Sequence, residues 1–342
     1  MKAAIFRKPY EPLSVEDVPV PAIASDQVLV KVVACGVCHT DLHYIDHGVK
    51  TFQQPPLILG HECSGIIERV GSAVTNIKEG ERVLLPAVVS CGFCRMCRLG
   101  RENICEQMCM FGNHINGAFA EYIAAPGKDV FVLPEELPLA ESCIIADALS
   151  TPYHAVKNRA QVRLGDRVVV FGCGGVGINV VQVAAAAGAT VLAVDIKEQK
   201  LEMARKLGAS HTINPAQCEF KKEFKRVFAG GADIAFEAIG NPVTLEQAVE
   251  SIRVGGRLCM IGYSEKTFSL NAARVMFREL EIVGSLGCRP VDYPAIIRLA
   301  AEGKVKVQPV VTHSFSLEEI NTALDHVRSG EGLRTIIKVA AL

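Results

Sequence analysis

The chain has 342 residues, 49% of them hydrophobic and 21% charged, which predicts a globular protein with two domains and excludes a disordered or collagen-like chain. Its formal net charge is −1, which argues against electrostatic capture of nucleic acid or of an anionic membrane. The N-terminus lacks an apolar signal segment, and the most apolar stretch, Val180–Val194, is shorter than the roughly 18 residues that span a bilayer. We therefore expect a cytoplasmic protein with neither nucleic-acid nor membrane partners.

Residues 1–149 contain short β-type runs separated by Gly, Pro and Asn, which predict an irregular β-rich domain. The runs are Gln27–Ala34, Gly65–Val70, Arg82–Leu85 and Ala118–Ala124. Eight of the 13 cysteines lie between Cys35 and Cys109. In a chain without an export signal, clustered thiols bind metal or stay reduced more often than they form disulfides.

Residues 150–287 have a different rhythm. Arg167–Phe171 is a continuous apolar strand that leads through a glycine turn into a small-residue helix ending near Ala187, and Thr190–Val194 is the next apolar strand. Further strands near 211–213, 232–239, 257–262 and 281–287 alternate with helical patterns. This alternation predicts an α/β domain with a doubly wound parallel sheet. Residues 288–342 revert to mixed elements, and we expect them to return to the first domain.

A glycine turn follows the strand Arg167–Phe171 and precedes the helix. Its residues fit G-x-G-x-x-G and are Gly172, Gly174, Gly175, Val176 and Gly177. In this context the pattern predicts a turn that binds the pyrophosphate of a dinucleotide. Asp195 ends the next strand and favours NAD over NADP, while Lys197 and Lys200 beside it leave some tolerance of NADP open. The alternative is that the glycines only pack a tight turn and Asp195 caps a helix.

Four cysteines form a compact lobe at about residues 88–109. They are Cys91, Cys94, Cys97 and Cys105, with the spacing C-x2-C-x2-C-x7-C. Four thiolates close a tetrahedral shell without an open position, so we predict a structural zinc site. An iron–sulfur cluster, four free thiols and a zinc ribbon that binds nucleic acid remain as alternatives.

A second set of possible ligands lies in Cys35–His43 and Gly60–Glu62. A catalytic zinc ion has about three protein ligands and one open position. By spacing, Cys38, His61 and Glu62 are plausible ligands, and a further ligand must come from elsewhere in the chain. The alternative is a set of buried thiols with a hydrogen-bonded core histidine.

The segments GVCHTDLH, GHE, CGFCRMCRLGRENIC and GCGGVG, in this order, resemble the zinc-containing medium-chain alcohol dehydrogenases. The resemblance covers essentially the whole chain and implies a GroES-like catalytic domain and a Rossmann domain. It implies that Cys38 and His61 bind the catalytic zinc, that Glu62 is a neighbouring carboxylate that enters the shell transiently, and that Asp41 orients the ligand histidine.

The third zinc ligand departs from the commonest pattern of this family. Where many members have a cysteine, alignment places Asp147, which has the same charge as a thiolate and is an acceptable zinc ligand. Cys143, four residues earlier, is the rival ligand. The segment ADALSTPYHAV looks most like the branch that contains 6-hydroxycyclohex-1-ene-1-carbonyl-CoA dehydrogenase.

The resemblance implies reversible hydride transfer between an alcohol and NAD, with two zinc ions per chain, in a homo-oligomer that is a tetramer or a dimer. The proton leaves through Thr40, the nicotinamide ribose and His43, and the cofactor pyrophosphate contacts His39 and Arg334. Small residues at Pro86–Val89 favour a secondary, cyclic or bulky alcohol. The alternatives are a cyclic hydroxyacyl-CoA substrate and a zinc-free NADPH-dependent quinone or enoyl reductase.

Overall fold

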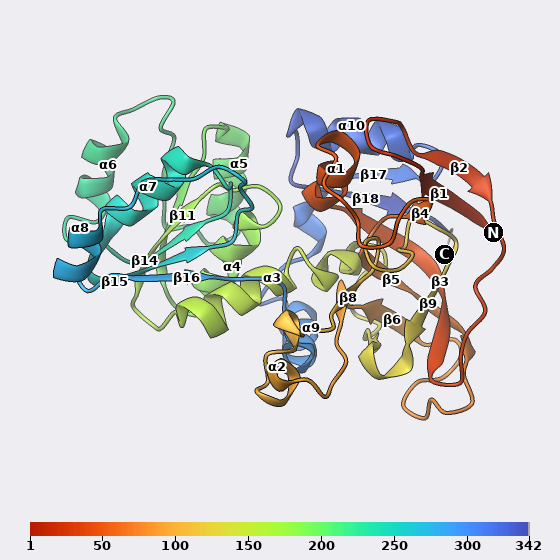
Figure 1. Ribbon diagram of the computed structural model, residues 1–342. Coiled ribbons are helices and arrows are strands. Elements are labelled where there is room, and N and C mark those ends of the chain that lie inside the picture. Colours follow the sequence, from red (N-terminus) through yellow and green to blue (C-terminus); the bar gives the residue numbers. More distant parts are fainter. Residues whose placement is uncertain (341–342) are drawn as a thin grey trace. The chain divides into compact units, whose positions relative to one another are not determined.

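The computed structural model describes residues 1–340 and divides the chain into two compact units. Unit 1 comprises residues 1–150, 287–303 and the chain from Val307 onward, and unit 2 comprises Thr151–Leu286 and Lys304–Lys306. Figure 1 shows both units coloured along the sequence. The breaks in the chain therefore fall at 150/151 and 286/287, against predicted domain boundaries at 149/150 and 287/288.

Unit 1 is rich in short strands and single helical turns. Its elements are β1 (Lys2–Phe6), β2 (Ser14–Asp17), β3 (Gln27–Val37), α1 (His39–Asp46), β4 (Leu57–Ile58), β5 (Glu62–Val70), β6 (Arg82–Leu85), β7 (Val88–Val89), α2 (Arg95–Arg98), η1 (Glu102–Ile104), β8 (Cys109–Met110), β9 (Tyr122–Pro126), η2 (Gly127–Asp129), β10 (Phe131–Val132), η3 (Glu141–Ala146), η5 (Pro290–Asp292), α9 (Tyr293–Ala301), η6 (Gln308–Val310), β17 (Val311–Ser316), α10 (Ile320–Ser329) and β18 (Arg334–Lys338).

The long strand β3 organises the main sheet of unit 1, whose order is β10-β6-β5-β3-β18-β17, with β9 paired to β3 as well. The antiparallel pairing with β5 aligns Gly36 with Glu62, and that with β18 aligns Val37 with Thr335. Segments far apart in the sequence therefore meet at the end of β3, directly before Cys38.

The expected strand at Ala118–Ala124 is wrong in its first half, because β9 begins only at Tyr122. Residues 117–119 instead donate backbone hydrogen bonds to the carbonyls of residues 58–60, the segment that precedes His61. Gly117 permits this close approach, since a Cβ atom there would lie 2.1 Å from the carbonyl oxygen of Gly60. This contact fixes the backbone that carries His61.

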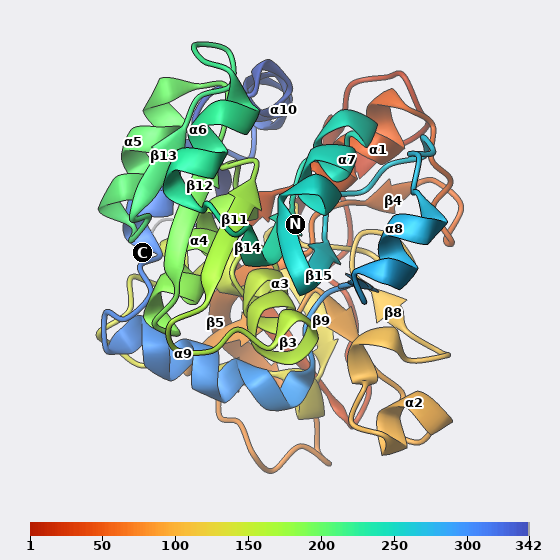
Figure 2. The ribbon, with the colours of Figure 1, turned by 90° about the vertical axis from the view of Figure 1, so that its left-hand side faces the viewer.

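Unit 2 is a six-stranded parallel sheet of order β13-β12-β11-β14-β15-β16, surrounded by helices (Figure 2). Its elements are α3 (Ser150–Tyr153), η4 (His154–Ala160), β11 (Arg167–Phe171), α4 (Gly177–Ala186), β12 (Thr190–Val194), α5 (Glu198–Lys206), β13 (His211–Ile213), α6 (Phe220–Val227), β14 (Ala232–Glu237), α7 (Pro242–Ser251), β15 (Ile252–Met260), α8 (Ala272–Phe277) and β16 (Glu281–Gly284).

The parallel sheet confirms the predicted α/β fold class. Helix α4 packs against β11 and β12, and α7 packs against β14 and β15. Val168, Val169 and Val170 of the first strand are fully buried, as expected for a strand covered on both faces. None of the helices in the described part of the chain is long and apolar enough to cross a membrane.

Candidate functional site

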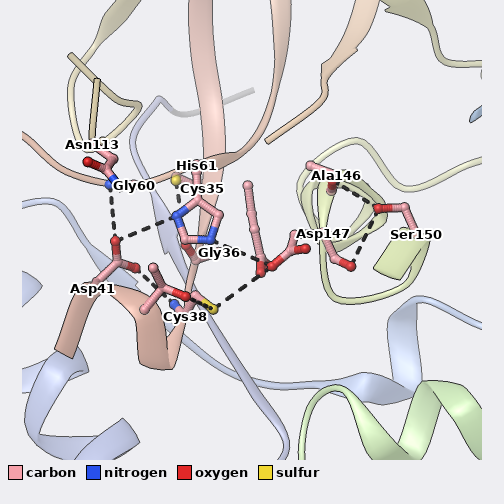
Figure 3. Close-up of polar contacts among 12 residues, drawn as sticks. Cys35, Gly36, Cys38, Asp41, Gly60, His61, Asn113, Ala146, Asp147 and Ser150 are labelled. Carbon is pink, nitrogen blue, oxygen red and sulfur yellow. Dashed lines mark hydrogen bonds and ion pairs between the residues drawn. The ribbon is translucent and has the colours of Figure 1, made fainter. Parts of the chain in front are cut away.

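Four side chains of unit 1 converge at the end of β3. Cys38, His61, Glu62 and Asp147 each offer one ligand atom, and these atoms lie within 4.8 Å of one another. Figure 3 shows three of them facing a common point: Oδ2 of Asp147 lies 3.7 Å from Nε2 of His61 and 4.0 Å from Sγ of Cys38. One thiol, one imidazole and two carboxyl groups make a donor set that suits zinc.

Local backbone structure positions each of these donors. Cys38 lies between the last residue of β3 and the first residue of α1. Gly60 has a positive φ of +91°, and a Cβ atom there would lie 2.9 Å from Sγ of Cys35, so only glycine fits beside His61. Asp147 follows η3, where the carbonyl oxygen of Ala146 accepts hydrogen bonds from Tyr293 at 2.6 Å and Ser150 at 3.0 Å.

Asp41 is the carboxylate behind the histidine. It is fully buried, its Oδ2 accepts a hydrogen bond from the backbone N of Cys38 at 3.0 Å, and its Oδ1 lies 3.7 Å from Nδ1 of His61. Burial raises the pKa of Asp41, and the neighbouring His61 opposes that rise. A carboxylate on this side of the ring aims Nε2 of His61 toward Cys38 and Asp147, which is the arrangement of a metal-ligating histidine.

The residues present fit a divalent metal ion. Nε2 of His61 and Oε2 of Glu62 are buried, and neither finds a hydrogen-bond partner within the described residues. Buried polar atoms without partners are costly, and a metal ion satisfies both without bringing a further protein group. We expect Cys38, His61 and Asp147 to hold zinc here, with Glu62 beside it.

Glu62 is also paired with Arg334, a contact that the sequence analysis missed. The guanidinium of Arg334 donates to Oε1 of Glu62, and the two side chains are 4% and 0% exposed. Burial raises the pKa of the Glu62 carboxyl, while the positive charge of Arg334 opposes the rise. Arg334 was expected at the cofactor pyrophosphate. Its guanidinium lies against Glu62, and its contact with the pyrophosphate stays a prediction.

Asp147, and not the alternative third ligand Cys143, belongs to the ligand cluster with Cys38 and His61 among the described residues. Cys143 lies within η3, is fully buried, and its pKa is raised well above its usual value by burial. The side chain of Asp147 is 23% exposed, and its Oδ2 lies beside Nε2 of His61 and Sγ of Cys38. The geometry therefore favours the aspartate as the third ligand.

The four cysteines of the lobe form a second group of possible metal ligands, separate from the cluster at Cys38. Their sulfur atoms are 3.5 to 3.9 Å apart along the contacts Cys91–Cys97, Cys94–Cys97, Cys94–Cys105 and Cys91–Cys105. A tetrahedron of Zn–S bonds of about 2.3 Å separates its sulfurs by about 3.8 Å. The cysteines of the chain are free thiols rather than disulfides. The lobe thus has the geometry of a closed zinc site.

Backbone amides donate to the sulfur atoms of three of these cysteines, Cys91, Cys94 and Cys105. The N–H of Cys94 donates to Sγ of Cys91 at 3.3 Å, and that of Gln107 donates to Sγ of Cys105 at 3.3 Å. The N–H of Cys97 donates to Sγ of Cys94. This hydrogen bond lowers the pKa of the Cys94 thiol to about 6, while burial acts in the opposite direction. Cys94 therefore ionises easily, as a zinc ligand must.

Helix α1 carries the residues predicted for proton transfer. Oγ1 of Thr40 lies 3.5 Å from Sγ of Cys38, so this hydroxyl borders the ligand cluster. His43 lies one turn further along the helix, half-buried, with its Nδ1 3.0 Å from Nδ1 of His47. His39, at the start of the helix, is exposed. No role was predicted for His47, although its spacing of four residues from His43 would place both rings on one face of a helix.

The glycine turn of unit 2 has the conformation that the pattern predicted. Gly172 has a φ of +88°, and a Cβ atom on Gly177 would lie 1.7 Å from the carbonyl oxygen of Gly172. A Cβ atom on Gly174 would meet nothing within 4 Å, so this position faces open space. Oδ2 of Asp195 accepts the N–H of Cys173 at 2.8 Å, which ties the carboxylate to the turn. Each carboxylate oxygen has a second lone pair for a ribose hydroxyl.

Comparisons with known proteins define the class. A model of the alcohol dehydrogenase GroES-like domain matches residues 24–135, and a model of zinc-binding dehydrogenases matches residues 175–302. Together with the parallel sheet and the two ligand clusters, these matches define a zinc-binding dehydrogenase with two domains.

Individual relatives agree. The chain is 36% identical to the sorbitol dehydrogenase of Bacillus subtilis (strain 168), over 95% of this chain and 93% of the relative. It is 36% identical to an alcohol dehydrogenase of Geobacillus stearothermophilus, over 99% and 100%. The solved alcohol dehydrogenase TADH from Thermus sp. ATN1 has a TM-score of 0.92 at 30% identity, covering 99% of this chain and all 100% of that one. The protein belongs to the zinc-containing medium-chain alcohol dehydrogenase family and is an oxidoreductase.

Proposed function

We propose that the protein catalyses reversible hydride transfer between a secondary or cyclic alcohol and NAD, with one catalytic and one structural zinc ion per chain. The observation that carries the proposal is the convergence of Cys38, His61, Glu62 and Asp147. Zinc bound there supplies Lewis-acid polarisation of the alcohol oxygen, and NAD accepts the hydride. The structural ion belongs to the four-cysteine lobe.

Other side chains of unit 1 orient the zinc ligands, transfer the proton of the alcohol and contact the cofactor. Asp41 holds the ring of His61, and Arg334 neutralises Glu62, which prevents this carboxylate from permanently competing with substrate for the metal. The hydroxyl of Thr40 accepts the proton of the alcohol and passes its own proton on. His43 would receive that proton beside the bound NAD and release it to water. His39 remains our proposed pyrophosphate contact.

The substrate class rests on two supports. The sequence has small residues at Pro86–Val89, and the relatives include a sorbitol dehydrogenase, whose named substrate has secondary hydroxyl groups. We expect kcat/KM to be higher for polyols and cyclic secondary alcohols than for ethanol. NAD reduction with a panel of primary, secondary, cyclic and polyol substrates, including a cyclic hydroxyacyl-CoA, measures this ranking. Ethanol as the best substrate contradicts the proposal.

Metal content of the same sample separates the proposal from its alternatives. Two zinc ions per chain support the dehydrogenase. A single ion in the lobe contradicts the catalytic site, and a zinc-free sample that reduces quinones with NADPH supports the reductase.

The preference for NAD rests on the carboxylate of Asp195, which repels a 2′-phosphate. The amides of Cys173 and Lys197 donate to different oxygens of Asp195, so Asp195→Asn removes the charge and keeps an acceptor for one of the two. We expect the ratio of kcat/KM for NAD to that for NADP to fall by about tenfold, the effect of roughly 1.4 kcal/mol. Steady-state kinetics with both cofactors measures it. An unchanged ratio would show that Asp195 only orders the turn, and Lys200→Ala in parallel shows whether that lysine supports NADP.

A homo-oligomer, dimer or tetramer, and a cytoplasmic location complete the proposal. Within unit 2, α8 buries none of its side chains, and Met276 and Phe277 at its end are 62% and 77% exposed. The neighbouring strand β16 pairs with β15 and lies at the edge of the sheet. An exposed apolar surface next to an edge strand is typical of a subunit contact.

A further inference from the structure

His43 in α1 and His47, directly after the last residue of that helix, are four positions apart and lie on one face of it. Nδ1 of His43 and Nδ1 of His47 are 3.0 Å apart, the ring centroids are 5.2 Å apart, and the rings are tilted by 43°. Residues four positions apart on a helix are neighbours, so the helix itself brings the two rings together. His43 is half-buried and His47 is exposed.

The short contact restricts how protons are distributed over the two rings. A hydrogen bond between two ring nitrogens needs one N–H and one lone pair, so the two Nδ1 atoms cannot both carry a proton. When a neutral His47 offers the lone pair, His43 carries its proton on Nδ1. The Nε2 of a neutral His43 then has a lone pair and is a base.

We propose that His47 is a positioning residue for proton transfer through His43. It accepts the Nδ1–H of His43, fixes the tautomer in which Nε2 is the base, and stabilises the imidazolium that forms when Nε2 takes a proton. That proton later leaves Nε2 for water, which restores neutral His43, and His47 stays neutral throughout. The inference rests on the proposed function, in which His43 receives the proton of the alcohol.

The carboxylates nearest in sequence to this end of the helix are engaged elsewhere. Both oxygens of Asp46 accept hydrogen bonds from Arg328 at 2.8 Å. Asp41 lies in the interior, against His61 and Cys38. An imidazole therefore meets Nδ1 of His43, at the position where a carboxylate orients many catalytic histidines. The C-terminal end of the helix also favours a positive charge on His43.

The test compares His47→Ala and His47→Gln in the zinc-containing protein, with His211→Ala as the control for loss of an exposed histidine. The nitrogen chemical shifts of the histidine rings report the tautomer of His43 directly. In His47→Ala we expect these shifts to move toward a mixture of tautomers. We expect kcat for alcohol oxidation to fall about 3- to 10-fold, the effect of one lost hydrogen bond, with KM for the alcohol unchanged.

The pH profile gives a further readout. Without its acceptor the imidazolium of His43 is less stable, so the midpoint of kcat/KM against pH moves to lower pH in His47→Ala. The amide oxygen of His47→Gln accepts the same hydrogen bond and restores both kcat and the profile. His211→Ala matches the unmodified protein.

Two results overturn the inference, and they differ from a failure of the proposed function. Unchanged nitrogen shifts of His43 in His47→Ala overturn it, whatever happens to kcat, because any loss is then structural. Equal losses in His47→Ala and His47→Gln also overturn it. If the shifts respond but kcat is unaffected even by His43→Ala, the His47 contact stands and the proton route of the proposed function is wrong.

Discussion

Replacement of Asp147 by alanine is expected to remove the catalytic zinc ion while the lobe keeps its own. Zinc content falls from about two ions per chain to one, and kcat/KM falls by about 10³-fold or more, because several kcal/mol of transition-state stabilisation depend on the metal. The remaining donors, Cys38 and His61, lack the third ligand that a catalytic site needs. Metal analysis and alcohol oxidation by NAD, on the same sample, measure both effects.

Two matched variants show whether the loss of zinc and activity in Asp147→Ala is due to the loss of a zinc ligand. Asp147→Cys supplies a thiolate of the same charge and should retain zinc and a measurable part of the activity. Cys143→Ser alters the rival ligand, four residues away in η3, and should keep both ions. Loss of zinc from Cys143→Ser, with Asp147→Ala unaffected, would reverse the ligand assignment.

Replacement of Cys97 by serine has the second large expected effect, on stability. Cys97 contacts the sulfurs of Cys91 and Cys94, so its loss opens the four-thiolate shell. Structural metal binding contributes to folding free energy, and a loss of about 3 to 5 kcal/mol lowers Tm by roughly 10 °C. One zinc ion per chain is lost, and limited proteolysis should cleave within residues 88–109. Thermal unfolding and metal analysis test the prediction.

Cys109→Ser is the control for this lobe. Cys109 lies in β8, paired with Val89 of β7, and is half-buried, but it is not one of the four converging cysteines. Its serine variant should keep two zinc ions and nearly the original Tm. Equal destabilisation by both substitutions would mean that the thiols of the lobe act by packing rather than by binding metal.

The features that were predicted most accurately from the sequence are those determined by residues close together in the chain. Strands β11 and β12 begin and end at the predicted residues, because the interior of a strand buried on both faces has to be apolar. The cysteine spacing and the glycine pattern are local as well, and both produce the expected geometry. Asp147 was placed through the family resemblance, since no spacing rule connects it with Cys38.

Contacts between distant strands were harder to predict. Arg334 meets Glu62 only because β18 pairs with β3 and β3 pairs with β5, a topology that periodicity does not specify. Likewise, residues 118 and 119 were predicted to begin a strand, but their backbone N–H groups donate to the segment before His61. In both places the structure depends on pairing between segments far apart in the chain, which the pattern of a single sequence does not specify.

The position of β18 in the middle of the main sheet of unit 1 has a consequence for biosynthesis. Residues 334–338 lie between β17 and β3, so the sheet that frames Cys38 and His61 closes only after almost the whole chain has left the ribosome. Unit 2 is built from nearly contiguous residues and can fold earlier. We therefore expect the nascent N-terminal half, which holds most of the cysteines, to stay incompletely folded until β18 has been translated. We expect metal to enter the cluster at Cys38 only after β18 has been translated.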